Sequence, residues 1–418
     1  MPGHNNCNPL TTEQLREKER EKQRQTSLAE DENPRKKVPR LGLNMTLLLQ
    51  KRQFGTAPGK SYSDMLLQIG HEVKVSGMKR QKLDVFNADN SNQNTDNFRL
   101  IVGDSSCERV FTVNDVSHGG AKYGIMSFSS NSRGALTVEM CDNLFFTNRK
   151  VNSVCWASVN FPDSHVLLCL VGGGDTPGCV SLLPASLYSN SNPVSLMVFS
   201  KSPRPGPAPG AFTLSLSRRI ILKDAENGRT QTYSVSSDVL AQQFSLRVPV
   251  LFNGCRSGEI FSFDLRQRGR KGQSWKTHRF HQESAVTSVR ILQDDNYLLA
   301  ADMSGQIKLW DVRMSKSVLQ YRGHYNEHAY LPIHVCEPEG LLLAVGQDCY
   351  TRIWSLRDGR LLRTVPSPHR AANDLIPSVV FSSNLGGHNG PPGLVMAVKN
   401  DLFYFPYNAD YEEIVLER

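Results

Sequence analysis

The chain is 418 residues long, 39% hydrophobic, and carries a formal net charge of +8. Its 31 glycines and 22 prolines favour many short strands joined by turns over long helices. The N-terminus lacks the apolar core of a signal peptide, and every apolar run is far shorter than the roughly 18 residues that cross a membrane. Nine cysteines without a C-x-x-C pair indicate reduced thiols. We therefore expect a soluble protein of the nucleus or the cytoplasm, with no membrane partner.

The positive charge is concentrated at the N-terminal end. Residues 1–60 hold 12 Lys/Arg and 7 Asp/Glu, a net charge of +5, so the other 358 residues carry only +3. Phosphate binding needs positive charge clustered on one face. We therefore expect a basic tail and no direct nucleic-acid binding by the folded part.

The first 94 residues have the pattern of a charged, partly helical or disordered N-terminal region. Residues 16–25 predict a helix of alternating acids and bases without an apolar stripe, which is solvated or held by a partner. The basic run at residues 35–40 fits a nuclear-import signal and a solvated linker equally well. The role of this region is left open.

From about Phe98 the pattern changes to short apolar strands separated by turn residues, which is typical of an all-β protein. Four prolines at residues 203–209 interrupt it, and a sheet interior does not hold such a run. Three segments then align on one aromatic residue, namely Phe263, Trp310 and Trp354, which are 47 and 44 residues apart. This period is that of WD repeats, in which each blade of a β-propeller has four strands. Residues 95–418 therefore predict a WD-repeat β-propeller of about seven blades, with six or eight still possible.

Further marks of the repeat lie around the third aromatic. A Gly-His dipeptide ends at His324, 30 residues before Trp354, and Asp348 stands six residues before it. These three residues predict a hydrogen-bond network that holds the outer strand of the blade. In the preceding blade we assign the histidine position to His281, and Ser304 stands where the turn aspartate is expected, so that network is predicted to be incomplete.

One motif points to an enzyme instead. Residues 324–328 spell H-x-x-E-H, a zinc-binding pattern that needs both histidines on one face of a long helix. Here the string follows a glycine at the start of a blade and runs into a proline, so a structural role of His324 is favoured. No P-loop, G-x-G-x-x-G or G-x-S-x-G motif is present. We expect no catalytic residue, no metal and no cofactor.

The chain as a whole resembles the WD-repeat substrate receptors that dock on the damaged-DNA-binding adaptor of cullin four RING ubiquitin ligases, in the group of the fourth cullin-four-associated factor. The similar stretches are residues 2–11, 145–158, 237–244, 251–261, 284–294 and 345–356. The resemblance implies a non-catalytic receptor whose partners are the adaptor, the cullin four ligase and a protein substrate that the sequence does not identify.

The resemblance also implies which residues bind the adaptor, because the family docks through a W-D-x-R motif at the end of a blade's third strand. Residues 310–313 match the motif fully, residues 263–266 keep D-x-R after a phenylalanine, and residues 354–357 keep only the Trp and Arg. An arginine at this position offers a planar set of donors to partner carboxylates or carbonyls. The implied adaptor-binding residues are Asp264, Arg266, Trp310, Asp311, Arg313 and Arg357. The alternative is a general WD-repeat scaffold in a nuclear, RNA- or chromatin-associated complex.

Overall fold

The computed structural model divides the chain into two compact units, residues 1–69 and 70–418. The predicted helix at residues 16–25, the basic run at 35–40 and the prolines at 203–209 lie outside the described residues. Helix α3 (Gly59–Ser76) begins in the first unit and ends in the second. No helix in the described part is long and apolar enough to cross a membrane. The described residues are 50, 53–54, 59–87, 97–104, 107–116, 119–130, 136–157, 165–171, 179–184, 211–216, 218–224, 229–245, 247–266, 276–369, 375–387 and 390–407.

The described strands of the second unit form seven sheets, numbered here by their order in the chain. Sheet 1 contains β2 (Val85–Asn87), β3 (Asn97–Gly103), β4 (Arg109–Asp115), β5 (Ala121–Ser130) and β6 (Leu136–Thr147); sheet 2 contains β7 (Val151–Ala157), β8 (His165–Leu170) and β9 (Cys179–Pro184); sheet 3 contains β10 (Ala211–Leu216), β11 (Arg219–Asp224) and β12 (Thr230–Ser234). Sheet 4 contains β13 (Val239–Phe244), β14 (Val250–Cys255), β15 (Glu259–Asp264) and β16 (Arg279–His281); sheet 5 contains β17 (Val286–Ile291), β18 (Tyr297–Asp302), β19 (Ile307–Asp311) and β20 (Lys316–Tyr321). Sheet 6 contains β21 (Ile333–Cys336), β22 (Leu341–Val345), β23 (Thr351–Ser355) and β24 (Leu361–Val365); sheet 7 contains β1 (Gln81–Leu83), β25 (Ser378–Ser382), β26 (Gly393–Val398) and β27 (Asp401–Pro406).

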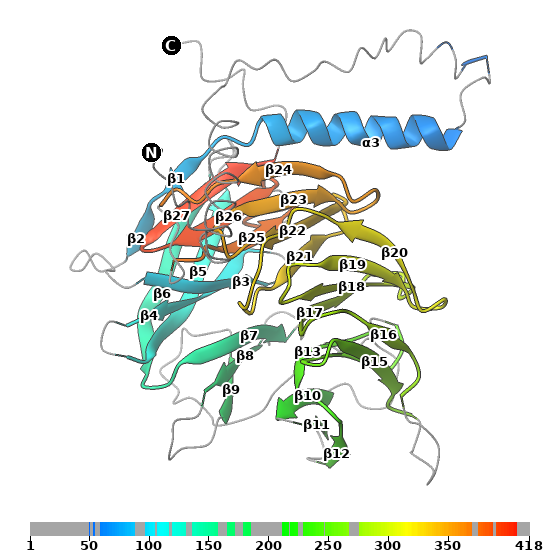
Figure 1. Ribbon diagram of the computed structural model, residues 1–418. Coiled ribbons are helices and arrows are strands. Elements are labelled where there is room, and N and C mark those ends of the chain that lie inside the picture. Colours follow the sequence, from blue (N-terminus) through cyan, green and yellow to red (C-terminus); the bar gives the residue numbers. More distant parts are fainter. Residues whose placement is uncertain are drawn as a thin grey trace, which may run out of the picture. The chain divides into compact units, whose positions relative to one another are not determined.

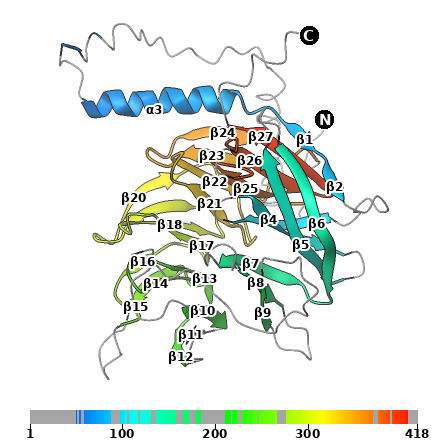
Figure 2. The ribbon, with the colours of Figure 1, turned by 180° about the vertical axis from the view of Figure 1, so that it is seen from behind.

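Two early strands belong to these sheets although they precede the predicted domain start at residue 95. Strand β1 pairs antiparallel with β27, so the beginning and the end of the second unit share sheet 7. Strand β2 pairs parallel with β6 as an extra strand of sheet 1. Figures 1 and 2 show both strands along the edges of their sheets. Such short strands carry too few residues for an alternating pattern, which is why the sequence did not reveal them.

The hydrophobic core lies between neighbouring sheets. Six buried clusters are present in the described part, and each joins the side chains of two sheets that follow one another around the molecule. Side chains that alternate along strand β18 belong to two different clusters. Leu298 and Ala300 pack toward sheet 4, whereas Leu299 and Ala301 pack toward sheet 6. Both faces of a sheet are therefore buried, which explains the continuous apolar runs.

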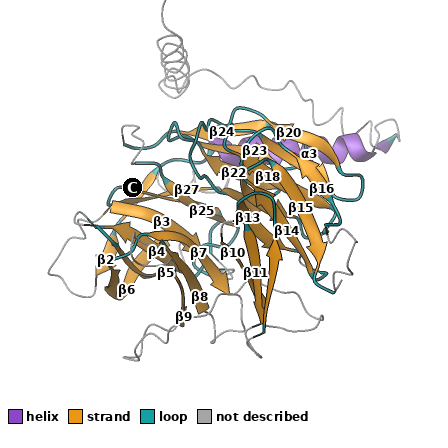
Figure 3. Cartoon of the chain, turned by 60° about the horizontal axis from the view of Figure 1, so that its bottom comes forward, coloured by secondary structure: helices purple, strands orange, loops and turns teal. Residues whose placement is uncertain are grey.

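The innermost strand is β3 in sheet 1, β25 in sheet 7 and the first strand in each of the other five sheets. These inner strands contact one another in the order β7, β3, β25, β21, β17, β13 and β10. Figure 3 shows β7, β10, β13 and β25 toward the middle of the view. Sheets stacked around a common axis through clusters between their faces form a β-propeller, so the predicted all-β fold is confirmed. The number of blades in the whole chain stays a prediction.

The last turn of α3 packs against sheets 6 and 7. Val75 and the following Met78 are part of the cluster between these sheets. Lys74 forms an ion pair with Glu339 at 2.7 Å, and the His71 ring lies 2.7 Å from the Tyr407 hydroxyl. These contacts fix residues 71–78 on the propeller immediately before strand β1 begins.

Candidate functional site

The repeated aromatic residue lies near the end of the third strand in three consecutive sheets. Phe263 on β15, Trp310 on β19 and Trp354 on β23 are 1%, 8% and 0% exposed, respectively. Each packs into the cluster shared with the preceding sheet. The aromatic therefore holds the strand in place and fixes the turn that follows it.

The turn after each aromatic has the same backbone geometry in the three sheets. The second residue after the aromatic donates its backbone N–H to a carbonyl in the loop between the first and second strands of the same sheet. The bonds run from Leu265 to Pro249 at 2.9 Å, from Val312 to Asn296 at 2.8 Å and from Leu356 to Gly340 at 2.8 Å. The residues that follow these turns therefore lie on the same rim of the propeller. They are Arg266, Arg313 and Arg357, and we call this rim the arginine rim.

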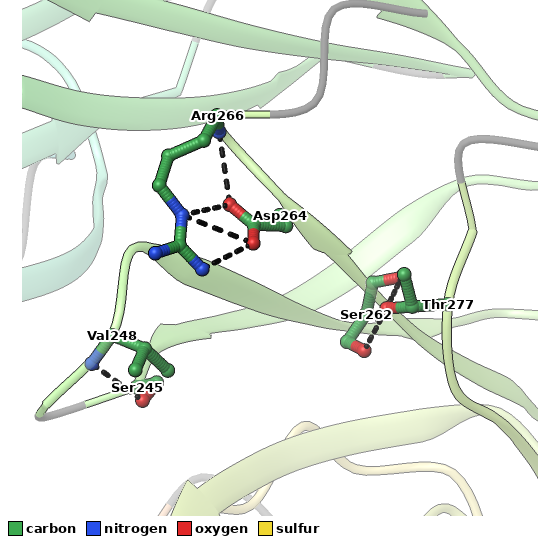
Figure 4. Close-up of polar contacts among 6 residues, drawn as sticks. All are labelled: Ser245, Val248, Ser262, Asp264, Arg266 and Thr277. Carbon is green, nitrogen blue, oxygen red and sulfur yellow. Dashed lines mark hydrogen bonds and ion pairs between the residues drawn. The ribbon is translucent and has the colours of Figure 1, made fainter.

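On two consecutive sheets the turn carries a closed arginine–aspartate pair. Asp264 accepts bonds from Arg266 Nε at 3.0 Å and Nη2 at 2.6 Å, and also from the Arg266 backbone N–H at 2.9 Å. Figure 4 shows the guanidinium folded over the carboxylate. Asp311 accepts from Arg313 Nε at 3.2 Å, Nη2 at 2.8 Å and the backbone N–H at 2.9 Å. The two blades thus repeat one arrangement.

The pairs combine a largely shielded carboxylate with an exposed guanidinium. The Asp264 and Asp311 side chains are 13% and 5% exposed, whereas those of Arg266 and Arg313 are 56% and 60% exposed. The bonds from the arginines hold the pKa values of both carboxyl groups below their usual range. Each aspartate stays ionised and fixes one cation at the surface.

The third copy is incomplete. Ser355 stands where the other two sheets have aspartate, and Arg357 is exposed beyond it. The third copy therefore keeps the arginine of the motif but not the acid two residues before it.

The arginine rim also links adjacent sheets through carboxylates that the repeat pattern did not reveal. Asp295, in the loop of sheet 5, accepts bonds from Ser245 Oγ at 2.7 Å and the Arg247 N–H at 2.8 Å in sheet 4. Glu337 in sheet 6 accepts the Gln293 N–H of sheet 5 at 3.0 Å. These residues lie in loops, and no regular spacing in the sequence predicts which residues they bond to.

The predicted network of His324, Asp348 and Trp354 is only partly assembled. The His324 ring packs edge-on to Trp354 with centroids 6.3 Å apart, but the Trp354 indole N–H donates to the Arg322 carbonyl at 2.8 Å. Asp348 instead pairs with Arg352 at 3.0 Å and 2.5 Å. An ionised arginine four residues away is a stronger partner for the carboxylate than a neutral imidazole. Burial lowers the pKa of His324 to about 4 and keeps it neutral.

The assignment of His281 to the equivalent position is wrong. His281 is exposed at the end of β16, and the buried residue is Gln282, whose carbonyl lies against Gly258 as that of His324 lies against Gly305. Side chains alternate along a strand, so a shift of one residue exchanges the two faces. The register of β16 therefore turns His281 toward solvent.

Ser304 stands where the turn aspartate was expected in sheet 5, and the carboxylate of this turn comes from Asp302, two residues earlier. Asp302, which is fully buried, accepts bonds from the Ser304 N–H at 3.0 Å, the Ser304 hydroxyl at 2.7 Å and the Gln306 N–H at 3.0 Å. The signal was present as Asp-x-Ser-Gly, in which an aspartate caps the backbone two residues on.

The H-x-x-E-H string is a loop and not a helix. Residues 322–332 have no helical turn, and the Tyr325 hydroxyl donates to Glu327 at 2.6 Å. Within the described ranges no group of three His, Cys, Asp or Glu residues is placed to hold a metal ion. The helical geometry of that zinc motif is therefore not formed.

The fold and the arginine rim define a WD-repeat propeller of the kind that presents binding surfaces on its rims. Residues 66–407 match the family model of the DDB1- and CUL4-associated factor 4 β-propeller domain. The human protein named DDB1- and CUL4-associated factor 4 is 52% identical over 427 residues, covering 98% of this chain and 84% of the relative. The human DDB1- and CUL4-associated factor 4-like protein 2 is 47% identical, covering 91% of this chain and 98% of the relative. The chain belongs to the DDB1- and CUL4-associated factor 4 family, which confirms the resemblance seen in the sequence.

A solved structure of the WD40 β-propeller domain of Doa1 is similar in fold, with a TM-score of 0.49, 16% identity and coverage of 78% of this chain and 97% of that one.

Proposed function

We propose that this protein is a non-catalytic substrate receptor that docks on DDB1 in a CUL4 ubiquitin ligase and does so through the arginine rim. The observation that carries the proposal is the pair of exposed guanidinium groups, Arg266 and Arg313, each fixed by its own shielded carboxylate on consecutive sheets. The names of the family relatives associate them with DDB1 and CUL4.

The chemistry of the arginine rim suits docking. Each aspartate accepts bonds from Nε and Nη2 of its arginine, so the Nη1 edge of each guanidinium is directed away from the aspartate. A guanidinium held in advance loses little side-chain entropy when it meets a partner carbonyl or carboxylate. Two such groups at equivalent turns present a repeated pattern of donors, which favours one orientation of the partner.

Arg266→Ala, Arg313→Ala and the double variant test the docking role. We expect the double variant to melt within about 2 °C of the wild type, because both side chains are exposed. Recovery of DDB1 and CUL4 in a pull-down should fall at least about tenfold, as for loss of charge-assisted contacts at an interface. Wild-type recovery of DDB1 by a normally folded double variant contradicts the proposal.

A matched control is available on the opposite end of strand β15. Arg256 is exposed, precedes β15 instead of following it, and forms an ion pair with Asp238 at 3.1 Å. Arg256→Ala removes the same charge from the other rim, so it should leave DDB1 recovery unchanged. An equal loss with Arg256→Ala would assign the effect to general charge.

The rival proposal is a scaffold that uses the same rim without a ligase. The two differ in what the wild-type protein brings down from cells, because a receptor recovers DDB1 and CUL4 in comparable amounts. Ubiquitination of a bound substrate that requires Arg266 and Arg313 supports the receptor.

A further inference from the structure

The arginine rim carries a large hydrophobic side chain that lies outside the W-D-x-R motif. Met314 follows Arg313 and is 70% exposed, more than any other large hydrophobic side chain described in the second unit. In sheet 6 the equivalent position is occupied by Asp358, whose carboxylate accepts the Arg360 N–H at 3.1 Å. Single exposed hydrophobic side chains are common on protein surfaces. Met314 therefore needs more than its exposure to indicate a binding surface.

The backbone of Met314 is held by the same carboxylate that holds Arg313. Asp311 Oδ1 accepts the Arg313 N–H at 2.9 Å and the Met314 N–H at 3.3 Å. The next residue, Ser315, adopts a left-handed conformation with φ 51°, which completes the turn. One shielded carboxylate thus fixes a charged residue and an apolar residue side by side at the surface.

A second exposed hydrophobic residue lies on the same rim in sheet 4. Val248, in the loop between β13 and β14, is 39% exposed. Its N–H donates to Ser245 Oγ at 3.4 Å, and this hydroxyl donates to Asp295 in the loop of sheet 5 at 2.7 Å. Figure 4 shows the loop of Val248 next to the turn of Arg266. We call Met314 and Val248 the apolar pair.

Hydrogen bonds join the loops of the apolar pair to both arginine turns. Pro249, next to Val248, accepts the N–H of Leu265 in the turn of sheet 4 at 2.9 Å. Asn296 accepts the N–H of Val312 in the turn of sheet 5 at 2.8 Å. The carboxylate before Asn296 bonds the two loops to each other. The apolar pair therefore lies on one hydrogen-bonded surface with the two exposed guanidinium groups.

The rim of sheet 6 is partly occupied by the chain itself. Glu339, in the loop between β21 and β22, forms an ion pair with Lys74 at 2.7 Å. Arg360, in the turn before β24, forms one with Glu72 at 3.0 Å. A partner that meets both aspartate-held arginines therefore extends over sheets 4 and 5, where the apolar pair lies.

We propose that the apolar pair is the hydrophobic part of the DDB1-docking surface, with Met314 as its main contact, and that it fits an apolar depression in DDB1 bordered by hydrogen-bond acceptors. This inference rests on the proposed docking function and adds the hydrophobic contact to it. Met and Arg are both enriched at interfaces, where apolar contacts exclude water from the charged ones. The unbranched thioether of Met314 also adapts to the shape of a pocket.

The arginines on this surface decide which partner fits it. A guanidinium offers donors only, so the surface that covers Met314 must supply acceptors to Arg266 and Arg313 as well. A second copy of the chain would present the same donor edges, which makes it a poor match for this rim. A different protein with acceptors around an apolar depression satisfies all the groups at once.

The equilibrium affinity of the purified full chain for purified DDB1 tests the proposal. Met314→Ala should bind at least about tenfold more weakly than the wild type, as for loss of a central interface contact. Met314→Leu should bind nearly as the wild type, because it keeps the apolar volume. Val248→Ala should weaken binding by a smaller factor. All three variants should melt within about 2 °C of the wild type, because the replaced side chains are exposed.

Val171→Ala is the matched control for Val248→Ala. Val171 is 43% exposed and lies in the loop between the second and third strands of sheet 2, the position that Arg256 has in sheet 4. It is thus on the opposite rim, and its loss should leave the affinity for DDB1 unchanged. Salt provides a second control, since raising it from about 0.1 M to about 1 M screens exposed charges. The loss caused by Met314→Ala should persist at high salt, whereas that of Arg266→Ala/Arg313→Ala should shrink.

Several results would overturn the proposal. They are wild-type affinity of Met314→Ala for DDB1, a Met314→Leu variant as weak as Met314→Ala, or a loss that disappears at high salt. A wild-type dimer in sedimentation that Met314→Ala dissociates would instead make the apolar pair an interface between copies. If Arg266→Ala/Arg313→Ala loses DDB1 while Met314→Ala retains it, only this inference fails. If the double arginine variant retains DDB1, the proposed docking through the arginines fails, whatever the result for Met314.

Discussion

Sheets 5 and 6 place a tryptophan at the same point of the third strand but hold it by different means. In sheet 6 the Trp354 indole N–H donates to the Arg322 carbonyl at 2.8 Å, and the His324 ring packs against it. In sheet 5 the Trp310 indole N–H is buried without a hydrogen-bond partner in the described part, and Gln282 replaces the histidine. Packing of the aromatic is common to both sheets, whereas the polar network is not. Burial of the aromatic side chain is therefore the feature that the repeat requires, whereas the hydrogen bonds around it differ from sheet to sheet.

The tight turns before these third strands show the same contrast. In sheet 5 the turn is closed by Asp302, whose Oδ1 accepts three bonds from residues two and four positions on. In sheet 6 the carboxylate of Asp348 pairs with Arg352, whose side chain is only 11% exposed. Both aspartates cap the backbone, since Asp348 also accepts the Tyr350 N–H at 3.3 Å, but only sheet 6 adds an ion pair.

The largest expected difference between the two sheets is in their response to pH. His324 has a pKa of about 4 in the folded protein against 6.5 when unfolded, so protonation favours unfolding. Its contribution is present above pH 6.5 and is lost as the pH falls toward 4, up to about 3 kcal/mol. His324→Gln should therefore flatten the dependence of the urea midpoint on pH between 7 and 4.5.

Sheet 5 has no histidine at this position, and His281→Gln supplies the control because His281 is exposed. Its pH profile should follow that of the wild type. His334 contributes in the same direction in both variants, since burial lowers its pKa to about 4 as well. A profile for His324→Gln as steep as that of the wild type would show that His324 is not held neutral.

The next largest effect concerns Asp302. Asp302→Ala removes the acceptor of three bonds at a fully buried turn and should cost about 2 kcal/mol of unfolding free energy. Asp302→Asn keeps the Oδ1 acceptor and should cost less than half as much. Denaturation of the two variants side by side makes the measurement. Equal losses would mean that the charge, and not the capping geometry, stabilises the turn of sheet 5.

The sequence revealed most of the fold wherever a strand is buried on both faces. The spacing of Phe263, Trp310 and Trp354 located sheets 4 to 6 because each aromatic fills the same place between sheets. It did not reveal β1 and β2, since three-residue strands have no readable period and their partners lie far away in the chain.

The candidate site was likewise predictable where its sequence pattern is local. The acid and the arginine of each rim pair are two residues apart, so a local motif contains the whole arrangement. The error at His281 is of a different kind, because a shift of one residue in strand register reverses which side chain is buried.

The smallest expected effect separates the two tryptophans. Trp354→Phe removes an indole N–H that donates to the Arg322 carbonyl, whereas Trp310→Phe removes one that has no partner in the described part. Both substitutions lose similar aromatic area, so the difference in unfolding free energy isolates the hydrogen bond, about 1 kcal/mol. Trp354→Phe should be the more destabilising of the two in urea titrations at pH 7. Equal losses would indicate that the bond to Arg322 adds nothing to packing, and would reduce the contrast between the sheets to the turns and the histidine.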